Sequence, residues 1–111
     1  MRDVRVTFLG TGTSAGIPAI GCQCATCSSD DPKDRRLRTS GAIEFVDGGG
    51  TPRVILIDAG PDLWQQALRH GLSRCDGVLL THNHVDHTWG LDELRRFNAV
   101  MGSGIDVYGP R

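Results

Sequence analysis

The chain has 111 residues, 39% of them hydrophobic and 23% charged, which is typical of one small globular domain. Its formal net charge of −1, from 12 basic and 13 acidic residues, predicts no general attraction to nucleic acids or anionic membranes. No apolar run is long enough to cross a bilayer and the N-terminus has no signal-peptide pattern, so we expect a cytoplasmic protein with no membrane partner.

The first half of the chain predicts three strands. Residues 3–9 alternate polar and apolar side chains, and a loop of small residues follows at 10–16. Residues 17–39 show little periodicity. Residues 42–47 and 53–58 are joined by GGGTP, which predicts a β-hairpin.

The second half predicts two helices that alternate with two strands. A short helix is expected at 61–71, ending at a glycine, with an apolar stripe of Leu63, Ala67 and Leu68. A buried strand is expected at 77–82, a second helix at 91–101 and a last strand at 105–110. This order indicates an α/β fold in which functional residues lie at strand ends.

The stretch THNHVDHTWG, residues 81–90, holds three of the four histidines of the chain beside an aspartate. Imidazole and carboxylate groups are ligands for zinc, manganese and iron. His82 and His84 are two residues apart at a strand end, so their side chains leave on one face and can bind one ion. Asp86 and His87 follow where the chain can turn toward a second ion. Two ions about 3.5–4 Å apart can share a water, lower its pKa and bind a phosphoryl or carbonyl oxygen.

The sequence THNHVDH resembles the H-x-H-x-D-H signature of the metallo-β-lactamase superfamily, whose hydrolases carry it after a buried strand. The segment LIDAG, residues 56–60, resembles the first motif of that superfamily, where a strand ends in an aspartate at the edge of the metal site. The resemblance implies the N-terminal half of a metallo-β-lactamase-like αββα sandwich. It also implies a hydrolase that uses a metal-bound hydroxide at a dinuclear site.

The resemblance implies roles for five positions. His82 and His84 would bind the first metal, and Asp86 and His87 the second. Asp86 would also help to orient the attacking water, which makes it the candidate catalytic residue. Asp58 would orient the histidine loop through hydrogen bonds. The expected catalytic cofactor is two zinc ions, with manganese or iron as alternatives, and no residue is assigned to substrate binding.

The superfamily completes its site with a further histidine, a bridging aspartate and a last histidine, all downstream of these motifs. The remaining histidine, His70, lies upstream in a predicted helix. We therefore interpret residues 1–111 as the N-terminal part of a single, apparently truncated domain. We expect this fragment on its own to bind metal weakly and to be inactive.

The segment GCQCATC brings Cys22, Cys24 and Cys27 too close together for a disulfide framework, and its spacing predicts a structural zinc site. A fourth ligand could be Cys75, His70 or a residue beyond Arg111. The segment GTGTSAGIPAIGCQCATCSSDDP resembles the phosphodiesterases of phosphonate breakdown that open cyclic phosphoribosyl phosphates. In that branch a cysteine cluster and a distant histidine hold a structural zinc.

A basic run, DRRLRTSG, precedes the second predicted strand and contains Arg35, Arg36 and Arg38. Arginine can bind phosphate with two hydrogen bonds, but a solvated polar surface is the preferred interpretation. We predict a phosphodiesterase that acts on a small molecule. The alternatives are a ribonuclease of the tRNA 3′-end-processing type, a thioester hydrolase of the same fold, and a zinc-binding module without catalysis. The sequence predicts no oligomeric state.

Overall fold

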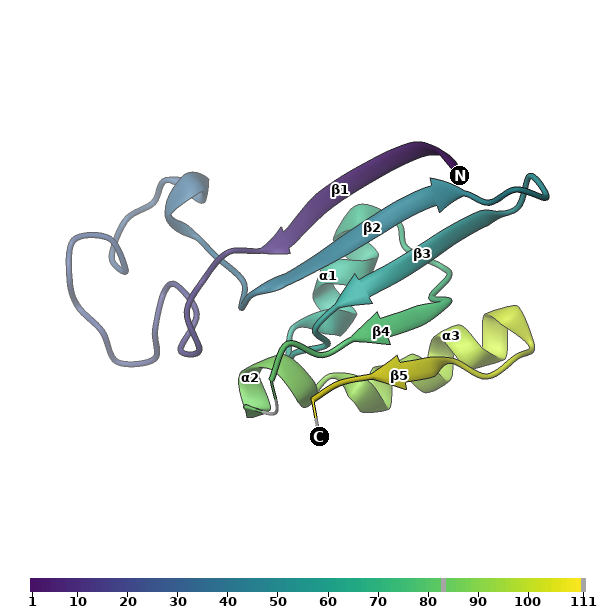
Figure 1. The fold of residues 1–111 in the computed structure, drawn as a ribbon. Helices are drawn as coiled ribbons and strands as arrows, with labels where there is room; N and C mark the ends of the chain where they lie inside the picture. Colours follow the sequence, from purple (N-terminus) through teal and green to yellow (C-terminus); the bar gives the residue numbers. More distant parts are fainter. Residues whose placement is uncertain (83, 111) are drawn as a thin grey trace.

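The computed structural model describes residues 1–82 and 84–110. The five strands and the two longer helices follow the predicted order, whereas the short helix α2 lies where a loop was predicted (Figure 1). In chain order, the elements are β1 (Arg2–Gly10), β2 (Ser40–Val46), β3 (Pro52–Ile57), α1 (Leu63–His70), β4 (Gly77–Leu79), α2 (Val85–Thr88), α3 (Leu94–Met101) and β5 (Asp106–Tyr108). Short 3-10 helices lie at Pro32–Asp34 and Leu91–Glu93. The predicted strand at 77–82 is shorter than expected, because its last three residues already belong to the loop that carries the histidines.

The strands form one five-stranded sheet in the order β1-β2-β3-β4-β5. β1, β2 and β3 pair antiparallel, with the predicted hairpin between β2 and β3. β3, β4 and β5 are parallel, since helical segments connect them and return the chain to the same end of the sheet. The C-terminal ends of β3 and β4 therefore lie side by side (Figure 1).

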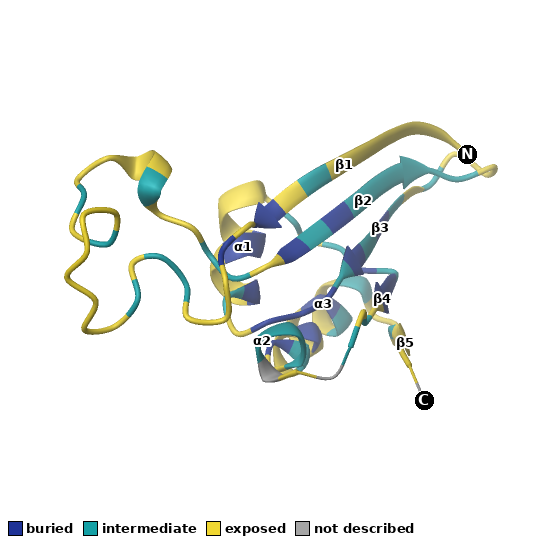
Figure 2. Ribbon diagram, turned by 60° about the vertical axis from the view of Figure 1, so that its left-hand side comes forward, coloured by how far each residue is buried: buried dark blue, intermediate teal, exposed yellow. Residues whose placement is uncertain are grey.

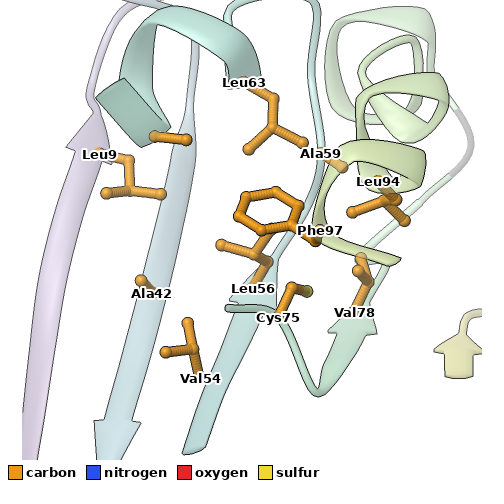
Figure 3. Close-up of a cluster of buried hydrophobic side chains, with 11 residues drawn as sticks. Leu9, Ala42, Val54, Leu56, Ala59, Leu63, Cys75, Val78, Leu94 and Phe97 are labelled. Carbon is orange, nitrogen blue, oxygen red and sulfur yellow. The ribbon is translucent and has the colours of Figure 1, made fainter. Parts of the chain in front are cut away.

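The hydrophobic core lies between one face of the sheet and helices α1 and α3 (Figure 3). Leu56 of β3 and Leu63 of α1 are fully buried there, and Phe97 of α3 packs against the same cluster. The predicted stripe of α1 is wrong at one position. Leu68 is 65% exposed, and Gln66 is buried in its place because its side-chain amide donates to the carbonyl oxygen of Arg38 (2.8 Å).

The opposite face of the sheet has no helix over it in the described part of the chain (Figure 1). Val6, Ile43 and Ile55 are register partners on β1, β2 and β3, and they point to this face because Val54 and Leu56 point to the core. Residues 1–82 and 84–110 thus form one helix layer on one sheet, which is the arrangement expected for half of a four-layer sandwich.

The loop between β1 and β2 extends away from the sheet and is largely exposed (Figure 2). Within residues 1–82 and 84–110, none of the helices has the length and apolar character needed to span a membrane.

Candidate metal centre

The two motifs meet at the C-terminal ends of β3 and β4. Asp58 follows β3, and its backbone N–H donates to the carbonyl oxygen of Leu79 (2.8 Å), which extends the pairing of the two strands by one residue. Asp58 adopts a left-handed conformation with φ of 63°, which turns the chain away from the sheet. Thr81 and His82 leave β4 beside this turn, so two segments distant in sequence share one edge of the sheet.

Asp58 is only 2% exposed. Its buried carboxylate is the centre of a hydrogen-bond network. Oδ1 accepts from the backbone N–H of Thr81 (2.8 Å), while Oδ2 accepts from the Thr81 hydroxyl (2.8 Å) and lies 2.6 Å from Nδ1 of His87. Burial opposes ionisation, but these hydrogen bonds outweigh it and hold the pKa of Asp58 below its ordinary value. Asp58 is therefore an ionised anchor for the histidine loop.

Backbone contacts hold the turn after Asp58 against α2. Ala59 N–H donates to the carbonyl oxygen of His87 (2.7 Å), and Gly90 N–H donates to the carbonyl oxygen of Ala59 (2.7 Å). A Cβ on Gly60 would collide with the carbonyl oxygen of Asp86, and one on Gly90 would collide with that of Gly60. Glycine is needed at both positions because the two backbones approach without room for a side chain.

The three imidazole rings of the motif converge. The ring centroid of His82 lies 4.4 Å from that of His84 and 4.1 Å from that of His87. His84 is exposed, whereas the side chain of His87 is only 14% exposed because it is held against Asp58. The sequence predicted that the chain turns after the strand. This turn is made by the short helix α2, which contains Asp86 and His87, rather than by an open turn.

The donor atoms of Asp86 and His87 suit a shared cation. Nδ1 of His87 carries its proton toward Asp58, because a carboxylate accepts and does not donate. Nε2 lies 3.0 Å from a carboxylate oxygen of Asp86, and in the neutral ring its lone pair faces that oxygen. Two electron-pair donors at this separation can both bind one ion at about 2.0–2.2 Å each. The side chains present therefore fit a divalent metal.

A second group of possible ligands lies in the exposed loop between β1 and β2. The sulfur atoms of Cys22, Cys24 and Cys27 all lie within 4.8 Å of one another. The backbone N–H of Cys27 donates to the Cys24 sulfur (3.4 Å), and that of Ala19 donates to the Cys27 sulfur (3.4 Å). The three thiols have the number and spacing of a partial zinc site.

The thiols of Cys24 and Cys27 influence each other, and their pKa values move in opposite directions. The hydrogen bond from the backbone N–H of Cys27, followed by those from the neighbouring thiols, lowers the pKa of Cys24 to about 7. Although the hydrogen bond from Ala19 favours the thiolate of Cys27, the thiols of Cys22 and Cys24 raise its pKa. Deprotonation of all three thiols would place like charges side by side, and a cation among them would remove that repulsion.

The structure argues against one fourth ligand that the sequence allowed. Cys75 is fully buried in the core, where its thiol donates to the carbonyl oxygen of Gly77 (3.4 Å), whereas Cys22 and Cys24 are exposed. Burial also raises the pKa of Cys75 to about 11, so this thiol is a core residue rather than a ligand. His70, the last residue of α1, lines a small cavity beside β1 and β2.

Arg35 and Arg36 are exposed, as the sequence predicted, but Arg36 and the partly buried Arg38 also have a structural role that it did not predict. The Arg38 guanidinium pairs with Asp62 (2.9 Å) and donates to the carbonyl oxygen of Ser14 (2.9 Å). Arg36 donates to the hydroxyl of Thr11 (3.1 Å). These two arginines therefore hold the base of the cysteine loop.

Sequence reasoning missed three contributors to the histidine site. The hydroxyl of Thr81 joins Asp58 to Nδ1 of His82 (2.9 Å), and Gly60 and Gly90 permit the backbone approach described above. Thr81 lies near the end of the strand predicted at 77–82, directly before the first histidine, and that position was the available signal. The role of Gly60 depends on a contact with α2, so the sequence offers no local sign of it.

The part of the chain that carries both motifs matches a known protein family. The family described as Beta-lactamase superfamily domain matches residues 53–111, which include Asp58 and the whole histidine loop. In three dimensions, the chain is similar to a diphosphatase from the PhnP family, with 44% identity, a TM-score of 0.84 and coverage of 95% of this chain and 41% of that one.

Two curated proteins are also similar in sequence. An octanoyltransferase of Porphyromonas gingivalis is 51% identical over 92 residues, which cover 83% of this chain and 18% of that protein. Coenzyme PQQ synthesis protein B of Methylobacterium nodulans is 35% identical over 103 residues, which cover 83% of this chain and 34% of that protein. The chain thus spans less than half of each relative, and the names of these relatives differ in the reaction they imply.

Proposed function

Because the chain belongs to the family of beta-lactamase superfamily domains, we propose that it carries the histidine part of the active site of a metal-dependent phosphodiesterase. The observation that carries this proposal is the convergence of three imidazoles and Asp86 at the ends of two parallel strands, behind the ionised anchor Asp58. A cluster of three imidazoles and a carboxylate is typical of a metal-binding site.

His82 and His84 bind one ion in this proposal, and Asp86 and His87 bind a second. Support comes from the ring contacts and from the 3.0 Å separation between Nε2 of His87 and Asp86, which suits a shared ion. Zinc is the expected metal, with manganese or iron as alternatives. When bound, such ions lower the pKa of a water and stabilise charge on a phosphoryl oxygen.

In this proposal the residues of this chain position the metal ligands and the attacking water, and they do not supply the nucleophile themselves. Asp58 keeps Nδ1 of His87 protonated and the ring fixed, so that Nε2 faces the site. The second carboxylate, Asp86, has a side chain that is 17% exposed, so it can reach a water at the mouth of the site. Asp86 therefore both binds the second ion and orients the attacking water.

Two observations favour a phosphodiester over other substrates. The similar structure at 44% identity is that of a diphosphatase, an enzyme of phosphate chemistry. The three clustered thiols also match the branch of phosphodiesterases that the sequence resembles. In this proposal Cys22, Cys24 and Cys27 hold a structural zinc that organises the long loop and takes no part in the reaction.

The test is hydrolysis of bis(p-nitrophenyl) phosphate by the full-length natural protein loaded with zinc or manganese. We expect activity that Asp86→Ala lowers by at least about a hundredfold, since misplaced reacting groups are costly. Asp92→Ala is the matched control, because Asp92 is an exposed acid in the same region and should leave the rate unchanged. Residues 1–111 alone should bind metal weakly and show little turnover.

Other outcomes would redirect the proposal. Turnover of thioesters without turnover of phosphodiesters would assign the protein to a thioester hydrolase, and selective cleavage of tRNA precursors would assign it to a processing ribonuclease. Stoichiometric zinc binding with no hydrolysis of any of these substrates would support a zinc-binding module without catalysis.

A further inference from the structure

The hydroxyl of Thr81 lies inside a continuous hydrogen-bond chain between Asp58 and His82. Its oxygen is 2.8 Å from Oδ2 of Asp58 and 2.9 Å from Nδ1 of His82. The backbone N–H of the same threonine donates to Oδ1 of Asp58 (2.8 Å). Thr81 is therefore held from two sides by one buried carboxylate, and its hydroxyl has a fixed place beside the first histidine of the motif.

The direction of each hydrogen bond in this chain follows from the groups present. An ionised carboxylate only accepts, so the single hydrogen of the Thr81 hydroxyl points to Asp58. The hydroxyl oxygen then has only lone pairs left for His82, and Nδ1 of His82 must be the donor. A neutral imidazole with its proton on Nδ1 has its lone pair on Nε2, and that nitrogen is the one free to bind a metal.

We infer that Thr81 is a positioning residue, whose hydroxyl fixes His82 in the Nδ1–H tautomer and presents Nε2 of that ring to the metal. One carboxylate thereby orients two imidazoles: His87 directly, at 2.6 Å, and His82 through the Thr81 hydroxyl. Thr81 itself touches neither the metal nor the substrate. This inference rests on the proposed function for the identity of the site as a metal centre.

Three variants of the full-length protein test the role of this hydroxyl. Thr81→Val removes the hydroxyl and keeps the branched shape, and the exposed position of Thr81 makes a packing defect small. Thr81→Ser keeps the hydroxyl and should rescue the site. Thr88→Val is the matched control, because the Thr88 hydroxyl donates to the carbonyl oxygen of His84 (3.2 Å) rather than to an imidazole. Thr81→Ala serves in place of the valine variant if that protein does not fold.

The first measurement is the tautomer of His82 in the metal-free protein, read from the nitrogen chemical shifts of its ring by NMR. We expect the Nδ1–H form in the wild type, Thr81→Ser and Thr88→Val, and a mixture of tautomers in Thr81→Val. The second measurement is the zinc dissociation constant of the histidine site, read from the same ring signals against a competing chelator. We expect it to rise about tenfold or more in Thr81→Val and to change less than about threefold in Thr81→Ser and Thr88→Val.

An unchanged His82 tautomer and zinc affinity in Thr81→Val would overturn the inference, as would a loss of affinity in Thr81→Ser as large as in Thr81→Val. Equal losses in Thr81→Val and Thr88→Val would also overturn it, because they would indicate general loosening of the loop. Failure of the proposed function is distinguishable, since it concerns turnover. A protein that binds zinc through His82 but hydrolyses no phosphodiester would contradict the activity and leave the role of Thr81 intact.

Discussion

The histidine loop and the cysteine loop both gather potential metal ligands, but the chain holds them in different ways. The histidine loop is bonded to a buried carboxylate that lies 29 residues from His87 in the sequence, and its backbone is paired with the turn after β3. The tip of the cysteine loop has short-range hydrogen bonds such as Ser28 N–H to the carbonyl oxygen of Cys24 (2.9 Å). The fold therefore organises the histidine loop through long-range contacts, whereas we expect the cysteine loop to depend more on a bound metal for its order.

The strongest test of this comparison removes one ligand from the organised site. His84→Ala should lower metal occupancy of the histidine site and reduce phosphodiester hydrolysis by at least about a hundredfold, because the remaining ion is misplaced. Zinc at the cysteines should be retained, since no ligand is shared. Metal content and turnover of the full-length protein provide the measurement. An unchanged total metal content would contradict the assignment of the histidine motif as a metal site.

The next prediction concerns the close backbone approach between Gly60 and Asp86, which supports the histidine loop. In Gly60→Ala the new methyl group would meet the carbonyl oxygen of Asp86, so we expect a loss of about 1–3 kcal/mol in the free energy of unfolding, with lower metal affinity at the histidines. Gly48→Ala is the control, because a Cβ at Gly48 meets no atom within 4 Å. Urea unfolding of both variants gives the comparison. Equal free energies of unfolding for Gly60→Ala and Gly48→Ala would show that the backbone approach at Gly60 tolerates a side chain.

Thiol reactivity should separate the two kinds of cysteine. The lowered pKa of Cys24, about 7, means that in the metal-free protein its reactive thiolate becomes abundant as the pH rises through 7. At pH 7, Cys24 should react with iodoacetamide about tenfold faster than an ordinary exposed thiol. Cys75 should stay unmodified, because it is buried and its pKa is raised to about 11. Mass spectrometry identifies the labelled residue, and added zinc should protect Cys24.

The smallest expected effect is on the stability of the cysteine loop. Cys24→Ser removes one zinc ligand from a loop that lies outside the core, so the zinc-loaded protein should lose about 1 kcal/mol in the free energy of unfolding, with turnover per folded molecule unchanged. Ser28→Ala, a change at an exposed neighbour, should have no effect on thermal unfolding. Normal stability together with abolished turnover in Cys24→Ser would mean that these thiols take part in the reaction.

The sequence alone predicted the order of the strands and of the two longer helices, the hairpin and the two clusters of candidate metal ligands. These features depend on local signals: alternation along β1, the turn residues between β2 and β3, and ligand spacings within one loop. Local pattern also predicted Asp58 as a partner of the histidine loop, through its resemblance to a known motif. The same kind of signal misplaced Leu68, because helical periodicity does not reveal that Gln66 finds a hydrogen-bond partner in the core.

Only the tertiary structure decided how the site is held together. The parallel alignment of β3 and β4 brings Asp58 beside Thr81, which lies 23 residues later in the sequence, and no local pattern encodes that contact. The close approach at Gly60, the path from Asp58 through Thr81 to His82 and the burial of Cys75 are likewise contacts between distant segments. The physical reason is that spacing along a chain fixes which side chains can share a face of one element, whereas packing between elements fixes which faces meet.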